Sequence, residues 1–182
     1  IANMIQDVTA RIGHANPSVV AESLRHADRV VGTKYMEPGM GDGGPCHPRD
    51  NIALSWLADK LNLGYDLFAD IMRSRERQCE LIAEQLCARD LPIVIMGRAF
   101  KPGVTLTDGS PAMLVAHYCE QQGRTIEWDC VHHTPAQYLL AHDQDYYTPE
   151  YPFAVGSIIH DMYRRYPNHL EDITVQWYGV RY

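Results

Sequence analysis

The sequence has no closely spaced cysteine pair, no long apolar run and no concentration of basic residues. Its five cysteines are an odd number and widely spread, with no CxxC pair and no secretory segment, so we expect reduced thiols in a cytoplasmic protein. No apolar run reaches the roughly 18 residues that suggest a membrane span. With a formal net charge of -7 and no basic patch, the chain is not expected to bind nucleic acid or an anionic membrane surface.

The composition is that of a folded globular chain. Its 182 residues are 46% hydrophobic and 21% charged, which suits one medium domain or two small ones with a sizeable core. The sequence opens on Ile1 instead of a methionine, in a segment that already has a helical pattern. We therefore expect a piece of a longer protein, although a processed chain is equally compatible.

The first half, residues 1–90, is predicted to be a helical domain. Apolar residues recur there at helical spacing, apart from one glycine-rich loop. A long helix is predicted over residues 65–89, and helices of this kind usually pack against partners. Its run from Arg73 to Arg77 is most simply a solvated face with local ion pairs.

The second half, residues 91–182, is predicted to be a small doubly wound α/β domain. Ser110 is expected to be the N-cap of a helix, with Pro111 as its first residue and Gly123 at its end. The expected elements, in chain order, are a strand at 93–96, a helix at 110–122, a strand at 125–130, a helical stretch at 134–142, a strand within 153–159, a short helix at 161–166 and a strand at 173–177. Alternating strands and helices predict a Rossmann-like parallel sheet that binds ligands at the carboxyl ends of its strands.

The stretch from Gly39 to Asp50 contains the most informative local pattern, because a glycine run leads to a single cysteine, Cys46. Glycines allow positive φ and a close approach of backbone to a ligand. Pro48 and Asp50 indicate the first turn of a helix, where the helix dipole favours a thiolate. A bare GxGxGG pattern is also typical of an ordinary surface turn, so the loop does not establish a site by itself.

A second loop, following the strand expected at 93–96, carries Lys101 and leads to the helix start at Ser110. Helix amide groups and a cation together make a natural phosphate site, although a loop lysine is more often simply solvated. Farther along, Cys130, His132 and His133 form a compact group of metal-ligating residue types. Because no second ligand pair accompanies them, we predict no metal site.

Together the two loops resemble motifs of the nucleotide-sugar dehydrogenase family, the UDP-glucose and GDP-mannose dehydrogenases. The matching stretches are VVGTKYMEPGMGDGGPCHPRD at 30–50 and GRAFKPGVTLTDGSP at 97–111. They occur in the family's order and are separated by a helix of suitable length. The resemblance implies the central and C-terminal domains of that family and, with the apolar stripes of the opening helix and of the helix at 65–89, a homodimer formed through these two helices.

The resemblance implies that Cys46 is the nucleophile of a four-electron oxidation. A sugar primary alcohol becomes an aldehyde and then a carboxylate, by way of a thiohemiacetal and a thioester, while two NAD molecules are reduced. Asp50 matches an aspartate expected to position or activate the attacking water. Arg49 stands where the motif has a lysine and is assigned to the cofactor.

The same resemblance assigns the nucleotide-sugar substrate to four positions. Gly43 and Gly44 would let the loop backbone lie against the sugar, and Tyr35 and Lys101 would contact the substrate. Asp129 resembles the aspartate of a Y-D-P turn, for which we expect a structural role.

Other features depart from the family's pattern and leave a second interpretation open. Asp42, Pro45 and His47 replace an aromatic residue, a serine and a phenylalanine, and the family's N-terminal NAD domain with its G-x-G-x-x-G turn is not found. We expect NAD to be bound mainly by a domain absent from this chain or supplied by another subunit, and we expect no turnover by the chain alone. The alternative is a non-catalytic module that serves dimerisation or nucleotide-sugar binding.

Overall fold

The structure is a computed structural model that describes residues 26, 40, 44–141, 153–163, 166–167 and 169–177. The chain divides into two compact units, residues 1–38 and 39–182, and every described helix and strand lies in the second. Tyr35, Gly43 and the helices predicted before residue 39 lie outside the described residues. A domain boundary near residue 90 stays a prediction.

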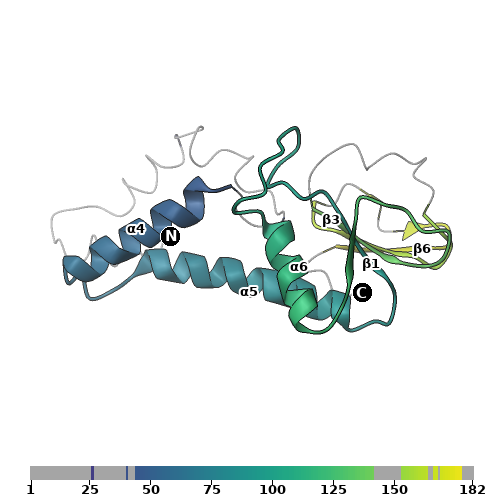
Figure 1. Ribbon diagram of the computed structural model, residues 1–182, viewed down its shortest axis with the longest axis horizontal. Helices are drawn as coiled ribbons and strands as arrows, with labels where there is room; N and C mark the ends of the chain where they lie inside the picture. The colour runs from purple at the N-terminus through teal and green to yellow at the C-terminus, as the bar shows by residue number, and fades with distance from the viewer. Residues whose placement is uncertain are drawn as a thin grey trace. The chain divides into compact units, whose positions relative to one another are not determined.

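Two helices form a hairpin at the start of the described chain. Helix α4 spans Cys46–Lys60 and α5 spans Leu67–Cys87, and they lie side by side (Figure 1). Positive φ values at Asn62 and Gly64 turn the chain between them. Asp66 caps α5, because its carboxylate accepts a hydrogen bond from the backbone N–H of Ala69 at 2.9 Å. The helix predicted over 65–89 is confirmed, with each end two residues shorter.

The exposed surface of α5 carries ion pairs within the helix, as predicted. Arg77 contacts both Glu80 and Glu84 at 2.9 Å, and Arg73 pairs with Asp70.

None of the described helices is long and apolar enough to cross a membrane.

A six-stranded sheet follows, with the strand order β2-β1-β3-β4-β6-β5. Every neighbouring pair is parallel except β5 with β6. The strands are β1 Ile93–Met96, β2 Ile126–Trp128, β3 Gln137–Leu140, β4 Ile158–Asp161, β5 His169–Leu170 and β6 Ile173–Trp177. Because the chain passes from β1 to one side and then returns to the other, this is the strand order of a doubly wound fold, with a switch point between β1 and β3. The predicted fold class is confirmed.

Helix α6, Pro111–Gln121, connects β1 to β2 as predicted. Pro111 occupies its first turn, and Gly123 follows its end with φ of 78°. Ser110 stands at the N-cap position, but its side chain does not cap the helix. Its hydroxyl instead donates to the carbonyl of Ala99 at 3.3 Å and so joins the loop to the helix start.

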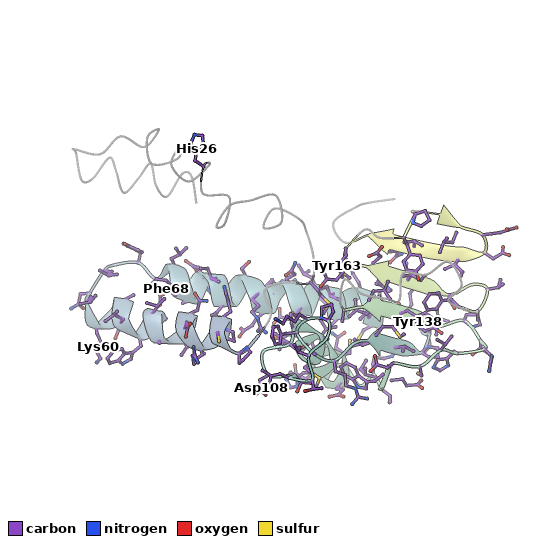
Figure 2. The ribbon with its side chains drawn as sticks, turned by 90° about the horizontal axis from the view of Figure 1, so that it is seen from above. His26, Lys60, Phe68, Asp108, Tyr138 and Tyr163 are labelled. Carbon is purple, nitrogen blue, oxygen red and sulfur yellow. The ribbon has the colours of Figure 1, made fainter. Side chains whose placement is uncertain are left out.

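Side chains of the parallel strands alternate between two buried clusters. Ile93 and Ile95 pack with α5 and α6, whereas Val94 and Met96 face the opposite side, where Tyr138 lies (Figure 2). All four residues of β1 are buried because both faces are covered, which is typical of a parallel sheet.

The helix predicted over 134–142 is wrong, since this segment contains β3. Tyr138 and Leu140 face one cluster and Leu139 faces the other, so all three are fully buried between two layers. A short apolar run has no periodicity that separates a doubly buried strand from a helix. The strand pairing with β1 and β4 decided the outcome.

The region after residue 153 was predicted less well. The strand expected within 153–159 overlaps β4 only at Ile158 and Ile159. The short helix expected over 161–166 is wrong, because Asp161 is the last residue of β4. Its carboxylate accepts hydrogen bonds from the backbone N–H groups of Tyr163 at 2.9 Å and Tyr166 at 2.7 Å, which holds a turn in place of a helix.

Two buried polar side chains, His160 and Gln137, connect the sheet to the end of α5. The Nε2 atom of His160 lies 3.3 Å from the side-chain oxygen of Gln137, and the Gln137 amide donates to the carbonyl of Leu86 at 2.9 Å. Burial, with a smaller effect from the charge of Arg89, lowers the pKa of His160 to about 3. The imidazole is therefore neutral in the folded state at neutral pH.

This pKa predicts a loss of stability in mild acid. Between pH 6.5 and 3 the unfolded state binds a proton at His160 that the folded state does not, so stability falls as the pH falls, by about 1.4 kcal/mol per pH unit from this group. We expect His160→Gln to flatten the dependence of the unfolding free energy on pH, measured by urea denaturation between pH 7 and pH 5. His133→Gln, which replaces an exposed imidazole, should keep the wild-type slope. Equal slopes for wild type and His160→Gln would contradict the prediction.

Candidate active site

Cys46 is the first residue of α4, and it is exposed. The helix begins two residues before Pro48, so the thiol stands at the N-terminus itself, with Pro45 in the N-cap position. No acidic residue lies in this first turn to oppose the positive end of the helix dipole. The local geometry therefore presents the thiol to solvent at a helix end that favours negative charge.

The residues predicted beside the thiol form an ion pair with each other. The Nε atom of Arg49 lies 2.8 Å from Oδ1 of Asp50, and both side chains are exposed. The hydrogen bond to Asp50, then its charge, then the nearby sulfur of Cys46 raise the pKa of Arg49. The guanidinium is thus placed near both the carboxylate and the thiol.

The first turn of α4 is held by a residue that the motif comparison did not single out. Asn51 is buried, and its amide donates to the backbone carbonyl of His47 at 2.8 Å. The same nitrogen lies 3.1 Å from Nδ1 of His47. These contacts fix the backbone on the turn that carries Cys46.

The cysteine loop meets the Lys101 loop through backbone atoms. The N–H of Gly44 donates to the carbonyl of Gly109 at 3.3 Å. At Gly109, where φ is 70°, an added β-carbon would lie 2.4 Å from the Gly44 oxygen. At Gly44, where φ is 100°, it would lie 3.1 Å from the ring of Phe100. The contact therefore depends on glycine at both positions.

Arg75 of α5 reaches the same contact. Its Nη2 atom donates to the carbonyl oxygen of Gly109 at 2.9 Å, and the residue is half-buried. The prediction of a solvated face over Arg73–Arg77 is therefore wrong for Arg75. The sequence contains no signal for this role, because Arg75 lies far from Gly109 along the chain.

Lys101 is exposed, and its Nζ atom lies 5.5 Å from the centroid of the Phe100 ring. Since that ring faces Gly44, Lys101 belongs to the segment that contacts the cysteine loop. At the carboxyl end of β1, the N–H of Gly97 donates to Asp129 at 2.6 Å, and Arg98 lies 3.7 Å from the same carboxylate. Asp129 thus anchors the start of the Lys101 loop.

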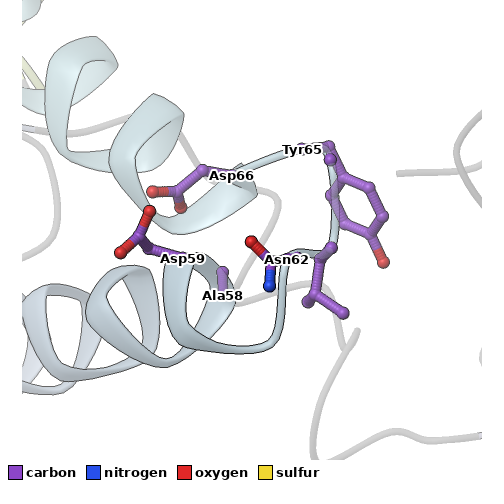
Figure 3. A pocket seen from close by; sticks show the side chains of 7 residues that line it. Ala58, Asp59, Asn62, Tyr65 and Asp66 are labelled. Carbon is purple, nitrogen blue, oxygen red and sulfur yellow. The ribbon is translucent and has the colours of Figure 1, made fainter.

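A separate hollow lies at the turn between α4 and α5 (Figure 3). It is at the Lys60 end of α4, away from Cys46. The Asp66 carboxylate there is held by the hydroxyl of Ser55 at 2.5 Å and by the N–H of Ala69, and these bonds lower its pKa. The polar groups at this hollow stabilise the helix start. The lining residues are Ala58, Asp59, Asn62, Leu63, Gly64, Tyr65 and Asp66.

The model of the UDP-glucose/GDP-mannose dehydrogenase family, central domain, matches residues 1–77. A UDP-glucose 6-dehydrogenase of Bacillus subtilis is 28% identical over 155 residues, covering 82% of this chain and 33% of the relative. A GDP-mannose 6-dehydrogenase of Pseudomonas aeruginosa is 25% identical over 146 residues, covering 76% of this chain and 34% of the relative.

Solved structures have the same fold. A GDP-mannose dehydrogenase from Pseudomonas aeruginosa superimposes with a TM-score of 0.69 and 17% identity, covering 96% of this chain and 48% of that one. A UDP-glucose dehydrogenase from Pyrobaculum islandicum superimposes with a TM-score of 0.62 and 18% identity, covering 98% of this chain and 46% of that one. The chain spans about a third of the curated relatives and about half of the solved chains. The resemblance predicted from the two motifs is confirmed.

The glycine contact predicts a difference between two Gly→Ala variants. Gly109 and Gly103 have nearly the same positive φ, 70° and 73°, but nothing lies within 4 Å of a β-carbon at Gly103. Gly109→Ala should lose roughly 1–3 kcal/mol more unfolding free energy than Gly103→Ala, because it alone forces two loops apart. Urea denaturation of both variants measures the difference. Equal losses would mean that the two loops do not depend on this contact.

Proposed function

We propose that this chain, a relative of UDP-glucose and GDP-mannose dehydrogenases, supplies the nucleophile for the NAD-dependent oxidation of the primary alcohol of a nucleotide sugar to a carboxylate. The observation that carries the proposal is the contact between Gly44 and Gly109. It ties the loop that ends at Cys46 to the loop that carries Lys101. The two motifs behind the resemblance, distant in sequence, therefore meet in one place.

The proposed chemistry uses the exposed thiol of Cys46. Its thiolate adds to the carbonyl carbon of the sugar aldehyde, forming a carbon–sulfur bond and a thiohemiacetal. Loss of hydride from that carbon, which the bound cofactor would accept, leaves a thioester, and attack by water breaks the carbon–sulfur bond to release the carboxylate, the thiolate and two protons. Asp50, four residues after Cys46 on the same helix, positions the water, and Arg49 beside it offers a positive charge to anionic groups.

The nucleotide sugar would lie along the joined loops. Gly44 is buried, with the Phe100 ring on the side where a β-carbon would stand, so its proposed role is to hold the loop backbone beside the sugar, and Lys101 is an exposed cation suited to an anionic substrate. Tyr35 and Gly43 complete the proposed substrate contacts, and both lie outside the described residues.

NAD, which the resemblance implies as the cofactor, accepts a hydride in each oxidation when bound. In the described part of the chain, the connection from β1 to α6 is a long loop, 97–110, unlike the tight glycine-rich turn of a dinucleotide site. Arg49 is the described residue that suits an anionic cofactor near the thiol. We therefore place the main NAD contacts on another domain or subunit.

A non-catalytic module is the second candidate, and one observation favours it. The Asp50 carboxylate already pairs with Arg49 at 2.8 Å, which competes with a role in positioning water. Such a module would keep the fold for dimerisation or for binding a nucleotide sugar. For either function we propose a cytoplasmic location, because the five cysteines are widely spread and include no CxxC pair.

Protection of Cys46 from alkylation distinguishes the two functions. Faster labelling of Cys46 is insufficient, because it is the exposed cysteine, whereas Cys79 and Cys119 are buried and burial raises the pKa of Cys119 to about 12. We expect UDP-glucose or GDP-mannose to slow the iodoacetamide labelling of Cys46 at least about tenfold, because the sugar covers the thiol. Peptide mass spectrometry over a time course measures this rate.

The control for this experiment is Lys101→Met, which removes the proposed substrate cation and should abolish protection without changing the rate in the absence of nucleotide. Protection by the free nucleotide alone, without the sugar, would favour the binding module. A labelling rate that no nucleotide sugar changes would contradict the proposed oxidation and nucleotide-sugar binding at this site, and would favour a module that serves dimerisation alone.

A homodimer is the proposed assembly, supported by apolar side chains exposed on α4. Ile52 and Trp56 are 61% and 62% exposed within the single chain. Burial of such residues against a second copy would stabilise association. We expect sedimentation equilibrium at micromolar concentration to give a dimer, and Trp56→Glu to shift it toward monomer. Val155→Glu, at an equally exposed apolar residue, should remain dimeric. A wild-type monomer would contradict the assembly.

A further inference from the structure

Three residues with metal-ligating side chains come together where β2 ends. Glu127 lies within β2, and Cys130 and His132 follow in the loop toward β3. One carboxylate oxygen, the thiol sulfur and one imidazole nitrogen all lie within 4.8 Å of one another. The sequence pattern had grouped Cys130 with His132 and His133, but the structure brings in Glu127 and leaves His133 exposed and outside this group.

The His132 imidazole lies so close to the Glu127 carboxylate that a cation between them would be stabilising. Its Nε2 atom is covered from solvent and lies 3.1 Å from Oε1 of Glu127, yet it forms no hydrogen bond. A nitrogen lone pair and a carboxylate oxygen at this separation repel each other unless a proton or a metal ion lies between them. The loop is held in this position because the backbone N–H of His132 donates to the hydroxyl of Tyr138 at 2.9 Å.

The Cys130 thiol is the third donor. Its Sγ lies 3.8 Å from Oε2 of Glu127. A metal ion would displace the thiol proton and form a sulfur–metal bond.

We propose that Glu127, Cys130 and His132 bind a divalent transition metal ion of the zinc class, with one coordination position left open. Sulfur, nitrogen and oxygen donors together suit Zn2+ better than Mg2+ or Ca2+, which prefer oxygen alone. Ligand bonds of about 2.0–2.3 Å in a tetrahedron place donor atoms roughly 3.3–3.8 Å apart. The Nε2–Oε1 distance of 3.1 Å and the Sγ–Oε2 distance of 3.8 Å involve different oxygens of Glu127, and one donor atom from each of the three residues lies within 4.8 Å of the others, so small side-chain rotations would bring the three donors to these separations.

Neighbouring acidic groups do not compete for this ion. The Asp129 carboxylate is already used by the N–H of Gly97 and by Arg98. Because Asp129 lies between Glu127 and Cys130, an ion bound there would hold the segment that anchors Gly97. The site would thus stabilise the carboxyl edge of β1 and β2, whether or not the proposed oxidation is correct.

The test is direct metal binding by the 182-residue chain after chelator treatment. We expect Co2+, used as a spectroscopic substitute, to produce a thiolate-to-metal charge-transfer band, and Zn2+ to abolish the band at about one equivalent per chain. Competition with a chromophoric chelator gives the Zn2+ affinity. Cys130→Ser and His132→Gln should each weaken it more than about 100-fold, because each removes a direct ligand.

Two controls separate this site from other binding. Cys46→Ser and His133→Gln should keep wild-type Zn2+ affinity, and circular dichroism of each metal-free variant should match the wild type. If a ligand variant fails to fold, Glu127→Gln serves as the second ligand variant. Absence of the cobalt band in the wild type, or its persistence in Cys130→Ser, would overturn the proposal.

Discussion

The contact between Gly44 and Gly109 is the constraint on which the candidate site depends. Backbone approaches backbone there, and a β-carbon at Gly109 would lie 2.4 Å from the Gly44 oxygen. The carbonyl of Gly109 also accepts the hydrogen bond from Arg75, so α5 joins the same point. Because Cys46 follows Gly44 by two residues and begins α4, its position is set by a contact with the loop that follows β1.

The sheet explains why that loop lies where it does. β1 and β3 adjoin at the switch point of the doubly wound order, and the segment leaving β1 must cross this edge to reach α6. Asp129 holds its first residue, Gly97, and the hydroxyl of Ser110 holds the loop at Ala99. Asp129 and Ser110 therefore hold the loop between β1 and α6 near its start, and the segment that contains Asp129 also carries the proposed zinc ligands.

Elements with strong local signals were predictable, whereas elements defined by burial were not. α5 and α6 have long helical patterns and, for α6, a proline at the start and a glycine beyond the end. β3 was predicted as a helix because Tyr138, Leu139 and Leu140 are consecutive apolar residues, whose pattern does not distinguish a buried strand from a helix. Pairing with the neighbouring strands β1 and β4 is what makes this segment a strand. The turn after β4 depends on one carboxylate, Asp161, whose acceptance of two backbone N–H groups has no sequence pattern.

The family resemblance, the candidate cysteine after the glycine run and the α/β class followed from the sequence, because motifs, glycines and periodicity are local properties of the chain. Tertiary structure alone decided that Arg75 leaves the solvated face of α5, that Gly109 is the partner of Gly44, and that Glu127 joins Cys130 and His132. Each of these contacts brings together atoms whose proximity depends on how the strands and helices pack. Hydrogen bonds and steric exclusion act over a few ångströms, so their partners become known only when the fold sets those distances.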